Sequence, residues 1–252
     1  MFLFERGWVI SDGIKLYIDP ISHFGQEIIS TKKYEPIFAQ ELIDTICPGD
    51  SILDIGANEG FFSLLAARAA GPRGKVFAIE PIPELVEVIN KNSKENGFDQ
   101  VTVFPLAFSE TAGEVKLNLS FSINSGASSL FDRKVSGTGQ IQVRSERFDD
   151  WWLKLGRPHF NVVKIDCEGA ELVVMRSAKK ALRDHFANFI FLDFHECIIG
   201  LSGVWEIDDC LRDSGYELTE LKSGVWCYHL PNPKNTNWIS RIKRTVPRLR
   251  TN

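Results

Sequence analysis

The sequence lacks the patterns that mark several common classes of protein. No apolar run approaches the roughly 20 residues that a membrane-spanning helix needs, and the first residues lack the basic start and long apolar middle of a signal peptide. The five cysteines are widely scattered without a Cys-x-x-Cys pair, which argues against a disulfide framework and against a zinc ribbon. There is no internal repeat and no low-complexity segment. We therefore expect a soluble, cytoplasmic globular protein with reduced thiols.

Acidic residues are missing from the end of the chain, where seven lysines and arginines follow Glu220. Removing these seven positive charges from the formal net charge of −4 leaves −11 for residues 1–220. Phosphate backbones attract basic surfaces, so this acidic body disfavours a nucleic-acid partner. The basic tail, residues 231–252, carries apolar residues at roughly helical intervals, which suits peripheral contact with an anionic membrane or with a phosphorylated acceptor. We favour the other interpretation of these residues, a disordered, solubilising tail.

Strand-like and helix-like segments alternate along the middle of the chain. The predicted strands are 51–55, 75–80, 101–105, 160–166 and 188–194, and the predicted helices are 59–70, 83–96 and 169–182. Such alternation is typical of parallel strands joined by right-handed crossovers, with helices on both faces of one doubly wound α/β sheet. A helix at 204–213 and two strands, 215–221 and 224–230, follow. The two residues between these strands are too few for a parallel crossover, so the last pair must be antiparallel.

Two other segments depart from this alternation. Residues 106–150 contain strand-like stretches on either side of a polar loop rich in Ser, Gly and Asn, which predicts an inserted hairpin. Before the alternation begins, residues 8–18 predict a small hairpin and residues 34–46 a helix. We therefore divide the chain into an N-terminal hairpin and helix packed on the core (1–48), the main domain (49–230) and the tail (231–252).

A glycine turn follows the first predicted strand, in the sequence Asp-Ile-Gly-Ala-Asn-Glu-Gly at residues 54–60. Gly56 and Gly60 allow the backbone to approach a ligand, and the helix start that follows presents unpaired N–H groups. The turn lacks both the Gly-x-Gly-x-x-Gly pattern of dinucleotide sites and the Lys-Ser/Thr of a phosphate-binding loop. The carboxylate of Asp54, which precedes the turn, suits a ligand that carries an ammonium group.

A second carboxylate, that of Glu80, lies at a position that suits binding of a nucleoside. Glu80 closes the second predicted strand, 24 residues after Gly56. An acidic residue at this position binds the ribose in dinucleotide-binding folds. The glycine turn and Glu80 together predict a nucleoside-containing cofactor.

Four stretches occur in the order found in the FkbM family of class I S-adenosylmethionine-dependent methyltransferases, which this chain resembles over roughly residues 40–200. They are residues 54–60, 78–81 (Ala-Ile-Glu-Pro), 124–130 (Asn-Ser-Gly-Ala-Ser-Ser-Leu) and 164–171 (Lys-Ile-Asp-Cys-Glu-Gly-Ala-Glu). The last string separates this family from the wider superfamily, which shares the glycine turn. The resemblance implies a seven-stranded, Rossmann-like, mostly parallel sheet, S-adenosylmethionine as cofactor, and O-methylation of a sugar, glycolipid or other small secondary-metabolite acceptor.

The resemblance also implies roles in cofactor binding for individual residues. Gly56 and Gly60 would line the methionine part, Asp54 would lie near its ammonium group, Asn58 would shape the turn, Glu80 beside Pro81 would hold the ribose, and Leu106 and Ala107 would border the adenine. Asp166 and Glu168 complete the expected cofactor-binding set.

Four polar residues follow two of the predicted strands: Asp166 and Glu168 after one, Asp193 and His195 after the next. Open α/β sheets bind ligands at these strand ends, so the group should converge beside the reacting methyl group. Either His195 or Asp166 removes the proton of an acceptor hydroxyl, or Asp166 and Asp193, joined by Glu168 or His195, bind a divalent ion that orients that hydroxyl and lowers its pKa. We favour base catalysis and take Asp166, Asp193 and His195 as the catalytic residues. The family often has Glu where this chain has Asp193, which leaves the role of this shorter acid open.

Structural roles compete with these assignments. Glu168 and Glu171 are able to cap the helix that begins near Gly169, where a carboxylate favours the helix dipole, and His195 would also suit a hydrogen-bonded position in the core. Two other functions stay open as alternatives: methylation of nucleic acid or protein, and a cofactor fold that serves only as an interaction module. The intact set of cofactor-binding residues argues against the interaction module.

Overall fold

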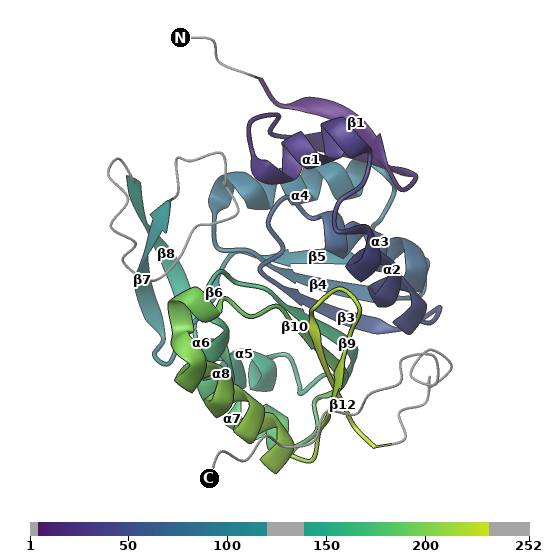
Figure 1. Cartoon of the computed structure of the whole chain (residues 1–252). Coiled ribbons are helices and arrows are strands. Elements are labelled where there is room, and N and C mark those ends of the chain that lie inside the picture. The colour runs from purple at the N-terminus through teal and green to yellow at the C-terminus, as the bar shows by residue number, and fades with distance from the viewer. Residues whose placement is uncertain (1–4, 120–138, 232–252) are drawn as a thin grey trace.

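A seven-stranded sheet forms the centre of the computed structural model, which describes residues 5–119 and 139–231 (Figure 1). Its strand order is β11-β12-β10-β9-β3-β4-β5. The strands are β3 (Ser51–Ile55), β4 (Lys75–Ile79), β5 (Val101–Phe104), β9 (Phe160–Ile165), β10 (Ala187–Leu192), β11 (Glu217–Glu220) and β12 (Trp226–His229). All neighbours pair in parallel except β12, which runs antiparallel to both β10 and β11. The doubly wound α/β sheet and its antiparallel last pair are therefore confirmed.

Helices cover both faces of this sheet because its strands are apolar on both sides. One face packs against α2 (Pro36–Thr45), α3 (Phe61–Ala70) and α4 (Pro83–Glu95). The other packs against α5 (Phe148–Lys154), α6 (Glu171–Ser177), α7 (Lys179–Arg183) and α8 (Glu196–Asp213). Successive strand residues alternate between the two cores, as Ile52 and Leu53 of β3 do. Parallel strands buried in this way end together at one edge of the sheet, where the polar residues follow them.

The inserted segment after β5 forms a small sheet of its own. The strands β7 (Gly113–Leu119) and β8 (Gly139–Glu146) are antiparallel, and the short β6 (Ala107–Phe108) pairs in parallel with β8. The expected hairpin is therefore present, but β6 and α5 were not expected from the sequence. The serine-rich stretch from 121 to 138, including the string at 124–130, lies outside the described residues, as does the tail from residue 232 onward.

Two predicted helices have different boundaries in the structure. The helix expected at 169–182 is divided at Ala178 into α6 and α7. The helix expected at 204–213 begins earlier, directly after His195, and is interrupted by Gly200, whose backbone is non-helical (φ 69°, ψ 164°). The apolar periodicity did not reveal these ends because a break in a buried helix leaves the apolar positions in place.

The N-terminal segment forms the expected hairpin, β1 (Gly7–Ser11) and β2 (Ile14–Ile18), followed by an additional helix, α1 (His23–Thr31). Two buried side chains tie it to the core. Asn92 on α4 accepts a hydrogen bond from the N–H of Tyr17 at 2.6 Å. Glu59, at the start of α3, accepts hydrogen bonds from Arg6 and from the N–H of Asp19, both at 3.0 Å. These contacts place the chain from α1 to α2 beside the carboxyl ends of the strands. No helix within residues 5–119 and 139–231 is long and apolar enough to span a membrane.

Candidate active site

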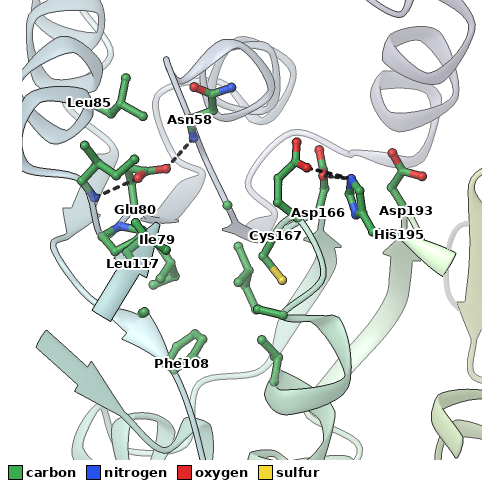
Figure 2. Close-up of a pocket in the computed structure, with 18 of the residues that line it drawn as sticks. Asn58, Ile79, Glu80, Leu85, Phe108, Leu117, Asp166, Cys167, Asp193 and His195 are labelled. Atoms are coloured by element: carbon green, nitrogen blue, oxygen red, sulfur yellow. Dashed lines mark hydrogen bonds and ion pairs between the residues drawn. The ribbon is translucent and has the colours of Figure 1, made fainter. Parts of the chain in front are cut away.

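The candidate site is a cavity of about 260 Å³ at the carboxyl ends of the parallel strands (Figure 2). Its walls come from the turns after β3, β4, β9 and β10, from β6 and β7, and from the N-terminal segment. Most of the residues predicted from the sequence line it, namely Gly56, Asn58, Glu80, Pro81, Leu106, Ala107, Asp166, Glu168, Asp193 and His195. Asp54 and Gly60 do not line it. The predicted residues thus converge, except for Asp54 and for Gly60, which is the N-cap residue of α3.

Gly56 occupies a position that admits no side chain. Its φ is +81°, and a Cβ atom built there would lie 1.9 Å from the carbonyl oxygen of Asp166. The N–H groups of Gly56 and Ala57 donate to the carbonyl oxygen of Ile79 at 3.1 and 3.0 Å, which fixes the turn to the end of β4. Glycine is therefore required because the turn after β3 passes directly against the end of β9.

Asp54 is engaged inside the protein. Its side chain is only 2% exposed, accepts a hydrogen bond from the Ser63 hydroxyl at 2.6 Å, and lies 3.2 Å from Nζ of Lys164. Lys164 also donates to the carbonyl oxygen of Gly56 at 3.2 Å and lies 3.4 Å from Asp166. Burial alone would lower the pKa of Lys164, but the charges of Asp54 and Asp166 raise it above its usual value. This geometry makes Asp54 a partner of Lys164 under the turn and leaves the ammonium contact expected of it without support.

Glu80 lies at the end of β4 with its carboxylate fixed by backbone N–H groups. One oxygen accepts from Asn58 at 2.8 Å and the other from Ile82 at 2.9 Å (Figure 2). Burial raises the pKa of Glu80 to about 7 despite these two hydrogen bonds. Each oxygen keeps a free lone pair for a ligand hydroxyl.

The end of the cavity beyond Glu80 is apolar. Leu106 and Ala107 line it as expected, together with three residues that the sequence analysis had not selected: Leu85 on α4, Phe108 on β6 and Leu117 on β7. On the turn itself, Oδ1 of Asn58 is buried and has no hydrogen-bond partner among the described residues. The cavity therefore combines an apolar end, a buried carboxylate and an unused buried acceptor.

At the opposite end, carboxylates surround His195. Its Nε2 atom lies 3.4 Å from Oε2 of Glu168 and 4.0 Å from Oδ1 of Asp166. Figure 2 shows His195 beside Asp166 at this end of the cavity. Asp193 lines the same end, and burial followed by the charge of Asp166 raises its pKa. The convergence of Asp166, Glu168, Asp193 and His195 at the ends of β9 and β10 is thus a property of the structure.

Glu171 fixes the orientation of the His195 imidazole and raises its pKa. Its side chain is fully buried, and Oε1 lies 2.9 Å from Nδ1 of His195 while accepting hydrogen bonds from the N–H groups of Cys167 and Gly169. Burial would lower the pKa of His195, but the hydrogen bond and charge of Glu171, followed by Glu168 and Asp166, raise it to about 9. The imidazole is therefore protonated at neutral pH. Glu171 is the first residue of α6, and the N–H groups that it holds, those of Cys167 and Gly169, precede this helix, so its side chain does not cap α6 by a hydrogen bond as expected.

Three of these side chains are arranged as metal ligands would be. Single ligand atoms of Asp166, Glu168 and His195 lie within 4.8 Å of one another. Asp193, which the sequence suggests as a metal ligand beside Asp166, is not part of this group. Two carboxylates and one imidazole suit several divalent ions, so the geometry is compatible with a metal without requiring one.

The N-terminal segment supplies a wall of the cavity that the sequence did not predict. His23 and Phe24 of α1, followed by Tyr34 and Glu35 before α2, line the cavity. Glu35 is directly followed by Pro36, the first residue of α2, and its backbone has a positive φ of 41°. The signal in the sequence was the Glu-Pro pair at a predicted helix start, but nothing local placed that start at the cavity.

The chain is similar in sequence to known methyltransferases. The Methyltransferase FkbM domain matches residues 54–218. Hexuronic acid methyltransferase AglP of Haloferax volcanii is 29% identical over 148 residues, covering 58% of this chain and 56% of that protein. The 2-O-methyltransferase NoeI of Sinorhizobium fredii is 26% identical over 162 residues, covering 59% of this chain and 65% of that protein. The chain therefore matches less than two thirds of the length of either relative.

Solved structures support the fold alone. A candidate rRNA methylase from Clostridium thermocellum superposes with a TM-score of 0.50 at 10% identity, over 76% of this chain and 92% of that one. The sheet order and the cavity at its carboxyl edge define a class I, Rossmann-like methyltransferase fold. The FkbM domain matches more than half of the residues of this chain. The chain therefore belongs to the FkbM methyltransferase family.

Proposed function

We propose that this protein is an S-adenosylmethionine-dependent O-methyltransferase that acts on a hydroxyl group of a sugar, a glycolipid or another small secondary-metabolite acceptor. The observation that carries the proposal is the composition of the cavity, with Glu80 toward one end and His195 among carboxylates at the other. Membership of the FkbM family supports methyl transfer. The names of the relatives AglP and NoeI, a hexuronic acid methyltransferase and a 2-O-methyltransferase, support a sugar acceptor.

The lining residues fit the proposed cofactor. Gly56 lines the cavity, and Oδ1 of Asn58 is a buried acceptor without a partner among the described residues. Glu80 has lone pairs free for the ribose hydroxyls, and the apolar surface around Leu106 suits the adenine ring. Pro81 and Ala107 complete this wall. S-adenosylmethionine, when bound, supplies a methyl group that its sulfonium makes electrophilic.

We assign proton removal from the acceptor hydroxyl to Nε2 of His195. Glu171 holds Nδ1, so Nε2 is the ring nitrogen directed toward Asp166 and Glu168. The imidazole accepts a proton only in its neutral form, which becomes more abundant as the pH approaches the raised pKa of about 9. A positive charge brought into the cavity would favour that neutral form at lower pH. Asp166 and Asp193 would orient the hydroxyl toward the methyl group.

A divalent ion is the second candidate for activating the hydroxyl. It would take Asp166, Glu168 and His195 as ligands and lower the pKa of a coordinated hydroxyl. It would also displace the proton of His195, which the surrounding carboxylates stabilise. We favour base catalysis because the hydrogen bond that Nδ1 of His195 donates to Glu171 already positions the imidazole for it.

Calorimetric titration with S-adenosylhomocysteine tests the cofactor assignment. We expect the unaltered protein to bind it and Glu80→Gln to bind it at least about tenfold more weakly, because a hydrogen bond from a ribose hydroxyl to a charged group contributes about 1.5–3 kcal/mol. Glu95→Gln, on the outward side of α4 where Glu95 pairs with Lys15, serves as the matched control. Absence of binding by the unaltered protein would refute the proposed cofactor.

A further inference from the structure

Glu35 is a carboxylate of the cavity that lies outside the matched FkbM residues. Its N–H donates to Oε1 of Glu27 on α1 at 3.4 Å, and Pro36 begins α2 directly after it. The positive φ of Glu35 is unusual for a residue with a side chain. This conformation directs the chain so that both Tyr34 and Glu35 line the cavity.

The charges that face Glu35 come from three elements of the protein. Asp166 and Lys164 belong to the end of β9, Asp193 to the end of β10, and Glu27 and Tyr34 to the N-terminal segment. Burial and then Asp166 raise the pKa of Glu35 to about 7, whereas Lys164 and the Tyr34 hydroxyl oppose this rise. Within the described part of the chain, no basic side chain approaches Glu35 to the distance of an ion pair. A carboxylate in such surroundings would gain from a cationic ligand group.

The location of Glu35 corresponds to one end of the proposed cofactor. Glu80 follows β4 and Asp166 follows β9, and β3 with its Gly56 turn lies between these two strands. With neighbouring strands about 4.8 Å apart, the two strand ends are about 10 Å from each other. A ribose at Glu80 would therefore extend its amino acid part across Gly56 toward Asp166 and Glu35. Asp54 is not available there, since Lys164 and Ser63 engage it below the turn.

We propose that Glu35, together with Asp166, binds the ammonium group of the cofactor's amino acid part. The inference rests on the proposed S-adenosylmethionine-dependent function and adds a residue to it. A charge-assisted hydrogen bond from an ammonium group to a carboxylate is stronger than one between neutral groups. The ammonium group would also lie between the carboxylates of Glu35 and Asp166 and so reduce their mutual repulsion. The N-terminal segment then closes the cofactor site and the family-matched residues alone do not complete it.

Two ligands that differ in the amino acid part test this role. S-adenosylhomocysteine carries the ammonium group, whereas 5′-methylthioadenosine keeps the nucleoside and thioether and lacks the amino acid. Both should be titrated into the unaltered protein, Glu35→Gln and the control Glu95→Gln. We expect Glu35→Gln to weaken binding of S-adenosylhomocysteine by at least about tenfold and to leave binding of 5′-methylthioadenosine unchanged, with Glu95→Gln like the unaltered protein for both.

The other outcomes overturn the inference in distinguishable ways. Equal weakening of both ligands by Glu35→Gln would mean that Glu35 only maintains the shape of the cavity. Unchanged affinities would mean that the ammonium group binds elsewhere. If the unaltered protein bound neither ligand, the proposed function would fail, and the role of Glu35 with it.

Discussion

Nδ1 of His195 lies 2.9 Å from Oε1 of Glu171, a carboxylate that has no exposed surface. The same oxygen accepts backbone N–H groups of Cys167 and Gly169, so the carboxylate cannot move without losing them. The pair fixes the orientation of the imidazole and leaves Nε2 toward the cavity. A buried acid behind a histidine in this way is typical of sites that transfer protons.

Substitution of His195 tests its assignment as the base. We expect His195→Gln to lower kcat for methyl transfer by about 10²- to 10⁴-fold, the usual contribution of general base catalysis, and to leave the affinity for S-adenosylhomocysteine nearly unchanged. His159→Gln is the matched control, because His159 is exposed and bonds to Asn188 and the carbonyl oxygen of His185. Full turnover by His195→Gln, measured with labelled cofactor, would remove His195 from the mechanism.

The pH dependence of kcat/KM should follow the raised pKa of His195. The base form increases as pH rises toward about 9, so kcat/KM should rise about tenfold per pH unit below that value. In Glu171→Gln the hydrogen-bonded charge is lost, the pKa of His195 falls, and the rising limb should move to lower pH. NMR titration of the imidazole gives the same pKa independently. A flat profile between pH 6 and 9 in the unaltered protein would contradict base catalysis by His195.

Gly56→Ala should disrupt the site through the backbone. The added Cβ meets the carbonyl oxygen of Asp166 at 1.9 Å while φ is positive, so we expect a loss of more than about 3 kcal/mol in the free energy of unfolding. Gly97→Ala controls for conformation alone, because Gly97 also has a positive φ but has no atoms within 4 Å of an added Cβ. It should cost about 1 kcal/mol. Urea denaturation of both variants measures the difference, and equal losses would show that the close approach is not the cause.

Glu80 should make the protein less stable as the pH rises. Its folded pKa of about 7 exceeds the ordinary value of 4.5, so between these values the unfolded state loses its proton before the folded state does. The free energy of unfolding therefore decreases from about pH 5 to pH 7. In Glu80→Gln this contribution disappears, and the decrease between pH 5 and pH 8 should shrink by about 2 kcal/mol. An unchanged pH dependence would show that Glu80 titrates normally.

A chelator separates the two catalytic candidates. If His195 acts as a base, methyl transfer should continue at an unchanged rate after treatment with excess chelator. If instead activity is lost and Mg²⁺ or Mn²⁺ restores it, then Asp166, Glu168 and His195 hold a metal. The unaltered protein before chelator treatment provides the reference rate, and the same protein freed of metal by dialysis is the starting point for adding Mg²⁺ or Mn²⁺.

The sequence predicted the parts of the site that depend on local chain geometry. The glycine turn at Gly56 and the carboxylate of Glu80 each follow a strand, and residues at the carboxyl ends of neighbouring parallel strands necessarily meet. The same rule predicts that Asp166 and His195 lie close together, as the structure shows. The sheet with its antiparallel last strands was predictable for the same reason, since short connections restrict the pairing.

The parts of the site that the sequence did not predict depend on tertiary contacts. Glu35 reaches the cavity because Asn92 and Glu59 hold the N-terminal segment against the core, and no periodicity records such contacts. The pairing of Asp54 with Lys164 could not be predicted from the sequence either, because the two residues are 110 positions apart. An acidic residue at the end of a strand gives the same sequence pattern whether its side chain contacts a ligand or a buried lysine, as Asp54 does.

Transfer of a labelled methyl group from S-adenosylmethionine to a hexuronic acid or another sugar acceptor tests the central claim most directly. The experiment compares the unaltered protein with His195→Gln and His159→Gln. Our account predicts labelled O-methyl sugar from the unaltered protein and from His159→Gln, and at most about one hundredth of that rate from His195→Gln. Label that stays on the cofactor across a panel of hydroxyl-bearing sugars, or appears only on protein or nucleic acid, would contradict it.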